Sequence, residues 1–191
     1  LLKSRKSAAL PGAKIYPPTL TNSDLANIKI AKEMGVTGVM QPFVRDHSDL
    51  ECVKEALREA GAEDIRLFAK IENMDGVRKL EKLLPAADEI VIARGDLGNA
   101  VHLWDLPGVQ RQISEKCRAA GKPFMVVTQM LASMERSPVP TRAEVNDIFH
   151  AVMDGAASIM VTGETAVGDY PVEVIRYMVN TVRSAEKKEN R

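Results

Sequence analysis

Five short apolar segments recur along this chain, and each is followed by a polar cluster and then by a stretch of helical period. The segments begin near residues 36, 65, 89, 123 and 158. Their β-branched composition and short length indicate strands rather than buried helices. Because they are apolar almost throughout, we expect them to be buried on both faces, as in a parallel sheet covered by helices. The sequence therefore predicts an α/β fold of five strand–loop–helix units.

The boundaries of the expected elements follow from apolar period, caps and turn residues. The expected strands are 36–40, 65–71, 89–93, 123–127 and 158–161. The expected helices run over about 22–34, 48–60, 76–84, 109–120 and 142–154, with a last one from Pro171. Capping boxes are predicted at Thr21–Asp24 and Thr141–Glu144. The helix-to-strand connections contain the turn residues Gly35, Gly61, Pro85, Gly121 and Gly155.

Polar residues cluster between the end of each expected strand and the helix that follows it. The clusters are Arg45, then Lys70/Glu72/Asn73, Arg94/Gly95/Asp96, Thr128/Gln129 and Thr162/Gly163/Glu164. In a parallel barrel the carboxyl ends of all strands lie on one rim, and active sites are assembled there from several loops. We therefore expect the functional site on this rim.

The residue types on the rim suit phosphoryl and enolate chemistry. Lys70 and Glu72 lie two residues apart in a strand and so project from the same face. Glu72 and Asp96 are hard oxygen donors suited to Mg²⁺ or Mn²⁺. Gly95 allows an anion to approach the backbone, and the N–H groups that follow can bind it. Hydroxyls at Thr128 and Thr162 complete a set that favours a phosphoryl group and an enolate.

Each of these residues also has a structural alternative. Glu72 can simply pair with Lys70, Asp96 can be a turn residue or helix cap, and Thr128 can bond to backbone at a strand end. The histidines His47, His102 and His150 fit no ligand spacing. With no histidine or cysteine in the clusters, a hydrolytic triad is excluded as the main interpretation.

Composition excludes several classes of partner. Lys+Arg and Asp+Glu both number 26, and aromatic residues make up 4%, so neither an anionic membrane nor nucleic acid is an expected partner. No apolar run approaches the roughly 20 residues of a membrane span, and no signal peptide is visible. Cys52 and Cys117 are isolated, as in reduced thiols of a cytoplasmic protein.

Several longer motifs resemble the pyruvate kinase family, in that family's order and spacing. They are Ala69–Asn73, Ile92–Gly98, Ala120–Pro123, Thr128–Met134, Pro140–Glu144 and Thr162–Ala166. The resemblance covers nearly the whole chain. It implies a (β/α)8 barrel of the TIM type that transfers phosphate between phosphoenolpyruvate and ADP, giving pyruvate and ATP in glycolysis, with Mg²⁺ (or Mn²⁺) and K⁺.

The resemblance also implies roles for matching residues. Lys70 would stabilise the phosphoryl group in transfer and the enolate, and Glu72 and Asp96 would be the Mg²⁺ ligands. Gly95, Asp96 and Thr128 would contact substrate, with Thr128 near the carbon that is protonated. Thr162 keeps the hydroxyl of the family's usual serine. Lys6 would match a weak contact to the nucleotide phosphate.

The resemblance covers only part of the family's architecture. Residues 1–20 would return from a lid domain, and residues 21–191 would supply barrel strands four to eight, while most K⁺ ligands belong to the earlier strands. The sequence departs from the family pattern at Ser7–Ala9, Pro42, Ala100 and Val139. We expect this piece to be incompetent alone and either to form a homo-oligomer or to need the missing half of the barrel. The alternatives are a Mg²⁺-dependent pyruvate or enolate lyase or aldolase, and a catalytically silent barrel fragment.

Overall fold

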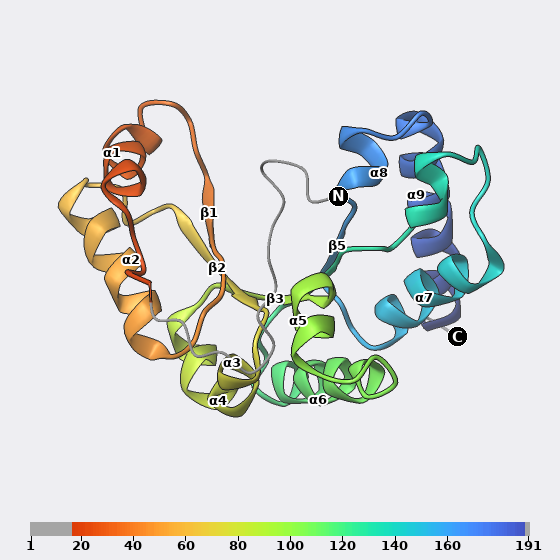
Figure 1. Cartoon of the computed structure of the whole chain (residues 1–191), viewed down its shortest axis with the longest axis horizontal. Helices are drawn as coiled ribbons and strands as arrows, with labels where there is room; N and C mark the ends of the chain where they lie inside the picture. Colours follow the sequence, from red (N-terminus) through yellow and green to blue (C-terminus); the bar gives the residue numbers. More distant parts are fainter. Residues whose placement is uncertain (1–16, 190–191) are drawn as a thin grey trace, which may run out of the picture.

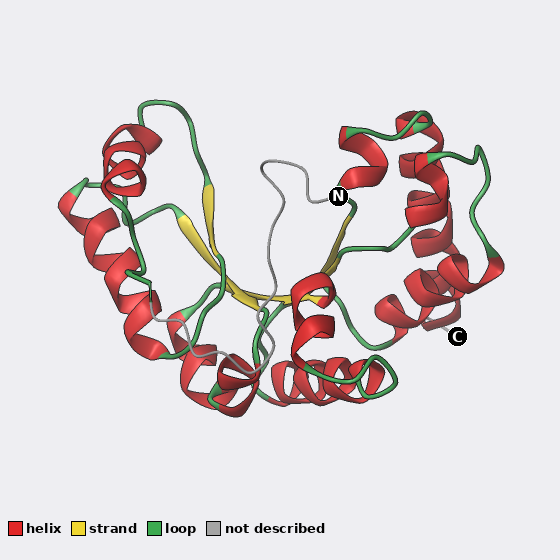
Figure 2. Ribbon diagram, viewed as in Figure 1, coloured by secondary structure: helices red, strands yellow, loops and turns green. Residues whose placement is uncertain are grey.

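A single parallel sheet organises the computed structural model, which describes residues 17–189. Its strands are β1 (Gly38–Gln41), β2 (Arg66–Ile71), β3 (Glu89–Ala93), β4 (Phe124–Val127) and β5 (Ser158–Met160). Every neighbouring pair is parallel, and the order in the sheet is the order in the sequence. Figure 2 shows the strands as an open arc. The predicted α/β class and five-unit organisation are confirmed.

Most of the helices connect successive strands on the convex side of the arc (Figure 2), while the first precedes β1 and the last two follow β5. They are α1 (Asn22–Ala31), α2 (His47–Glu59), α3 (Met74–Arg78), α4 (Leu80–Leu83), α5 (Arg94–Ala100), α6 (Leu106–Ala119), α7 (Arg142–Met153), α8 (Gly163–Ala166) and α9 (Pro171–Glu189), with 3₁₀ turns η1 (Leu84–Ala86) and η2 (Ala132–Glu135). In Figure 1, α2, α4, α6 and α7 follow the outer side from one end of the sheet to the other. None of the helices within residues 17–189 has the length and apolar composition needed to cross a bilayer.

Two apolar clusters, one on each face of the sheet, explain the composition of the strands. The larger cluster joins the convex face to the helices and includes Ile92, Leu80 and Ile113, all fully buried. The smaller one lies on the opposite face and centres on Val91 and Val127. All five residues of β3 are buried, as expected for a strand covered on both faces. The outer strands β1 and β5 are only partly buried, because within residues 17–189 each is paired on one side alone, so the expectation of full burial was wrong for them.

The helix ends agree with the predicted caps. Both capping boxes form, at Thr21 with Asp24 and at Thr141 with Glu144. The first helix ends at Ala31, before the expected Met34. The four glycines in the helix-to-strand connections all have positive φ, which favours glycine over residues with a Cβ. These turns lie at the edge of the sheet where the strands begin.

Other segments also differ from the sequence-based expectation. The helix expected over 76–84 is broken at Lys79, whose backbone leaves helical geometry, so α3 and α4 are separate short helices. α3 also begins earlier than expected, because the Asn73 side chain accepts a hydrogen bond from the Gly76 N–H and caps it. The segment Arg94–Gly98, expected as a polar loop, forms most of α5 directly after β3.

We predict that Ile92→Ala lowers the free energy of unfolding by about 2 to 5 kcal/mol. The side chain is fully buried in the centre of the sheet, so truncation removes apolar burial and leaves a cavity. Urea denaturation followed by circular dichroism measures the change. The matched control is Val172→Ala on α9, where the side chain is 64% exposed, and it should change stability by less than about 0.5 kcal/mol. Equal effects of both substitutions would contradict this description of the core.

Candidate active site

The end of β2 contributes a buried ion pair. Lys70 Nζ lies 2.9 Å from Glu72 Oε1, and the two side chains are 25% and 2% exposed. The predicted side-by-side projection of Lys70 and Glu72 is therefore confirmed. The other carboxylate oxygen, Glu72 Oε2, accepts a hydrogen bond from the Phe43 N–H at 2.7 Å. Glu72 thus joins the end of β2 to the loop that follows β1.

Phe43 is held in an unusual backbone conformation by this contact. Its φ is 51°, a left-handed value that generally costs a residue with a Cβ about 1 to 2 kcal/mol. The hydrogen bond from its N–H to a carboxylate is of the stronger, charge-assisted kind and offsets part of that cost. The Phe43 side chain itself is 54% exposed. Glu72 therefore fixes the backbone of the β1 loop as well as the ammonium of Lys70.

The end of β3 supplies Gly95 and Asp96, which lie in the first turn of α5. Asp96 is exposed, whereas the Gly95 N–H donates a 2.8 Å hydrogen bond to Thr128 Oγ1. That amide is therefore already used within the protein. A Cβ built at Gly95 would meet only the Thr128 side chain, at 3.5 Å or more, so the protein itself leaves room for a larger residue there. Space beside an exposed carboxylate is what a bound anion and cation would need.

The end of β4 has two consecutive residues in the left-handed region. Thr128 has φ 75° and Gln129 has φ 53°. Strain of this kind persists only where the surroundings hold it, and it is common at functional sites. Arg94 NH2 donates to the Thr128 carbonyl at 2.8 Å, while Thr128 Oγ1 accepts from Gly95. These two hydrogen bonds fix the positions of both the backbone carbonyl and the hydroxyl of Thr128.

A buried glutamate joins the ends of β4 and β5. Glu164 accepts from the Thr162 N–H at 2.8 Å and from the Leu131 N–H at 3.2 Å, and it is 2% exposed. The Thr162 hydroxyl lies 3.5 Å from the same carboxylate. Sequence reasoning placed Glu164 on the rim but did not foresee this bridge, because the partner is a backbone amide in another loop.

Asp49 is a further buried carboxylate, and the sequence analysis did not identify it. Asp49 accepts hydrogen bonds from the Arg45 backbone N–H, from the Arg45 guanidinium and from Thr19 Oγ1. Burial by itself raises the pKa of Asp49, but these hydrogen bonds outweigh it and lower the pKa to about 2. The available signal was the spacing of Arg45 and Asp49, which lie four residues apart. Through these hydrogen bonds, Asp49 connects Thr19 in the segment before α1 with Arg45 in the loop after β1.

The structure brings some of the expected site residues into contact and leaves others apart. Lys70 contacts Glu72, and Gly95 contacts Thr128. β2 and β3 are paired neighbours, which places Glu72 and Asp96 after adjacent strand ends. Among the described residues, no three His, Cys, Asp or Glu side chains cluster in a way that could hold a metal ion. Lys6 lies outside the described residues.

Glu72 and Asp96 nevertheless fit a Mg²⁺ site of the kind that uses few protein ligands. Mg²⁺ in phosphoryl-transfer sites is commonly bound by one or two carboxylates together with water and substrate oxygens. Both residues are carboxylates, and Asp96 is exposed to solvent beside Gly95. Glu72 Oε1 contacts Lys70 and Oε2 accepts from Phe43, and each carboxylate oxygen has a further lone pair that can bind a cation. The donor set suits Mg²⁺ or Mn²⁺.

The histidines and cysteines take part in none of the rim contacts described above. His47, His102 and His150 are exposed, and the ring of His102 stacks on Trp104. Cys52 and Cys117 are both free, and burial raises the pKa of the Cys117 thiol to about 12. A buried thiol with so high a pKa is a poor nucleophile at neutral pH.

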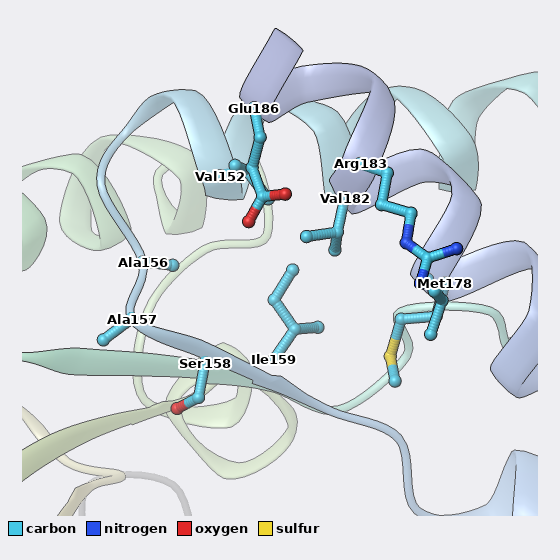
Figure 3. Close-up of a pocket in the computed structure, with 10 residues that line it drawn as sticks. Val152, Ala156, Ala157, Ser158, Ile159, Met178, Val182, Arg183 and Glu186 are labelled. Carbon is cyan, nitrogen blue, oxygen red and sulfur yellow. The ribbon is translucent and has the colours of Figure 1, made fainter. Parts of the chain in front are cut away.

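A separate hollow of about 330 Å³ lies at the other end of β5. Figure 3 shows it between Ser158 and Ile159 of β5 and the side chains of Met178 and Val182 on α9. Because these residues stand at the amino end of β5, the hollow is remote from Thr162 at the carboxyl end. Its lining is mixed, with Ser158, Arg183 and Glu186 beside the apolar residues (Figure 3), and none of the rim residues named above lines it.

A parallel α/β sheet with its polar residues at the carboxyl ends of the strands defines this chain as a barrel-type protein. The sequence matches the family described as "Pyruvate kinase, barrel domain" over residues 1–175. It is 41% identical over 189 residues to pyruvate kinase of Bacillus licheniformis, covering 99% of this chain and 32% of that protein. Against pyruvate kinase of Dictyostelium discoideum it is 41% identical over 189 residues, covering 99% of this chain and 37% of the relative.

A fungal relative gives the same result. Pyruvate kinase of Candida albicans is 41% identical over 186 residues, which cover 97% of this chain and 37% of that protein. The chain belongs to the pyruvate kinase family. It spans about a third of the length of these relatives.

The Asp49 cluster generates a pH-dependent prediction. A carboxyl whose pKa falls from 3.8 to about 2 on folding stabilises the folded state above pH 4 by roughly 2 kcal/mol. That contribution is lost as the pH falls from about 4 to about 2. Asp49→Asn should therefore lower the free energy of unfolding by roughly this amount at pH 7, and the difference from wild type should shrink towards pH 2.

Urea denaturation at several pH values measures this difference. Asp75→Asn, at an exposed ion pair with Arg78, is the matched control and should change stability by less than about 0.5 kcal/mol. A difference between Asp49→Asn and wild type that stays constant from pH 7 to pH 2 would show that the carboxylate does not stabilise the fold.

Proposed function

We propose that the protein of which this chain is part is a pyruvate kinase, which transfers a phosphoryl group between phosphoenolpyruvate and ADP and forms pyruvate and ATP in glycolysis. The observation that carries the proposal is the Lys70–Glu72 pair at the end of β2, beside Gly95 and Asp96 at the end of β3, in a chain of this family. The pyruvate kinase relatives support it, although the chain covers about a third of their length.

The residues of the rim have chemically suitable places in this reaction. Lys70, one quarter exposed, presents a positive charge that would stabilise the phosphoryl group in transfer and then the enolate oxygen. Glu72 would hold the ammonium in place. The Thr128 hydroxyl, beside Gly95, would lie near the carbon that accepts a proton, and Thr162 would add a second hydroxyl from β5. Gly95 and Asp96 would contact the substrate from the first turn of α5.

Cations complete the proposed site. Glu72 and Asp96 would hold Mg²⁺ or Mn²⁺, and a bound dication would neutralise charge on the phosphoryl oxygens. K⁺ is expected from the family, with most of its ligands in strands that this sequence does not contain. Lys6 is proposed as a weak contact to the nucleotide phosphate.

The proposal includes the organisation of the whole protein. Residues 1–20 would return from a lid domain, and residues 21–191 would form strands four to eight of a (β/α)8 barrel. The exposed edges of β1 and β5 need a partner, supplied either by the rest of the barrel or by a homo-oligomer. We expect the five units alone to be inactive. A glycolytic role and two free thiols favour the cytoplasm.

For single residues, the contacts that a purely structural role predicts are also observed. Glu72 does pair with Lys70, Asp96 does lie in a helical turn, and Thr128 does bond to backbone. These contacts keep a catalytically silent barrel fragment as the second interpretation. A lyase or aldolase acting on a pyruvate-like enolate is the third, because barrels reuse similar rims for different reactions.

The first test replaces the proposed catalytic lysine in the full-length protein. Lys70→Met should lower kcat for ATP formation from phosphoenolpyruvate and ADP by at least about a thousandfold, because no other charge replaces the ammonium at that position. A coupled assay run with and without K⁺ measures it. The control Lys32→Met, at an exposed pair with Asp64, should retain wild-type kcat. Carbon–carbon cleavage that needs no ADP would instead support the lyase.

The second test measures metal binding apart from turnover. Wild type should bind Mn²⁺, and Glu72→Gln should weaken the binding by at least about tenfold, because an amide is a poorer ligand for a hard cation. Paramagnetic relaxation of water or calorimetry reports the affinity. Glu115→Gln, on the exposed side of α6, is the control. Absence of Mn²⁺ binding in the wild-type protein would favour the silent fragment.

A further inference from the structure

Arg94 is a largely buried arginine that joins the end of β3 to other parts of the chain. It begins α5 at the end of β3, and its side chain is only 12% exposed. Arg94 NH1 donates to both carboxylate oxygens of Asp147 on α7, at 2.8 and 2.7 Å. Its NH2 donates to the Thr128 carbonyl at 2.8 Å and contacts Met130 Sδ. One guanidinium therefore contacts two separate parts of the chain, α7 and the segment that follows β4.

The carbonyl that Arg94 contacts belongs to a strained segment. Thr128 and the next residue both have positive φ, and a conformation of that kind must be held by its surroundings. The same Thr128 presents its hydroxyl to the Gly95 N–H, and Gly95 is the residue after Arg94. The ends of β3 and β4 are thus tied at two points, one through the guanidinium and one through the hydroxyl.

Asp147 fixes the guanidinium from a rigid element. α7 is anchored by its capping box, and the capping residue Glu144 also accepts hydrogen bonds from the Ser133 N–H and Oγ in the segment after β4. α7 therefore contacts the β4 segment directly through Glu144 and indirectly through Asp147. The planar guanidinium can meet a carboxylate and a carbonyl at once, which an ammonium group cannot do in the same way.

We propose that Arg94 and Asp147 are positioning residues for the candidate site: together they hold the Thr128 carbonyl and so keep the Thr128 hydroxyl against Gly95. The expected effect on kcat rests on the proposed function, whereas the expected effect on the hydrogen bond between Thr128 and Gly95 does not depend on it. The simpler alternative is an ion pair that stabilises the fold and leaves the hydroxyl unaffected.

The experiment compares Arg94→Lys and Asp147→Asn with wild type in the full-length protein. Hydrogen–deuterium exchange, resolved to the Gly95 amide, should be faster by at least about fivefold in both variants, because the hydrogen bond to Thr128 weakens. The kcat for the phosphoenolpyruvate and ADP reaction should fall by about tenfold or more with KM changed by less than about threefold. The double variant should resemble the single ones, because the two residues act as a unit.

Matched controls separate positioning from general loss of charge. Arg111→Lys and Asp64→Asn change exposed ion pairs outside the rim and should leave the Gly95 exchange and kcat as in wild type. A lowered melting temperature with wild-type exchange at Gly95 would overturn the proposal and leave a merely structural ion pair. Faster exchange with unchanged kcat would overturn its role in the reaction. A wild-type protein without kinase activity would contradict the proposed function, while the exchange would still decide the positioning.

Discussion

The parallel direction of the five strands is the constraint on which the rest of the structure depends. Because every strand runs the same way, each polar cluster that follows a strand reaches the same rim. Residues separated by dozens of positions, such as Gly95 and Thr128, then meet at hydrogen-bond distance. The turn glycines lie at the opposite edge, where they end helices. The parallel topology alone thus places the polar clusters and the turns that end the helices at opposite edges of the sheet.

Charged groups hold the rim together alongside apolar packing, to which the fully buried Val44, Leu97 and Met130 contribute. Glu72 and Glu164 each join the segments after two strands, through a lysine or backbone amides, and Asp147 holds Arg94 at the end of β3 from α7. Such groups are strongly coupled to their partners, because an unpaired charge in the same place would be severely destabilising. They can therefore keep backbone in left-handed conformations, as at Phe43 and Thr128, that apolar contacts would not specify. Strain and buried charge occur together here for that reason.

The sequence predicts the parts of the structure that depend on local pattern. The strand at 89–93, both capping boxes and the pairing of Lys70 with Glu72 follow from period and spacing, and the structure has them. The break at Lys79 and the helical Arg94–Gly98 segment were not predicted, because local sequence pattern does not determine these conformations. They depend on contacts with distant parts of the chain that form only in the folded protein. The same holds for Asp49, whose burial depends on Thr19 thirty residues earlier.

The pairing of the site residues with one another does not by itself favour a silent protein. A site for an anionic substrate and a cation contains opposite charges, and without those ligands the charges neutralise each other internally. Lys70 remains one quarter exposed and Asp96 is exposed, so both can exchange a protein partner or solvent for a ligand. Glu72, in contrast, is almost fully buried and holds Phe43 as well as Lys70. Glu72 can therefore keep its position while the more exposed Lys70 and Asp96 side chains rearrange around it.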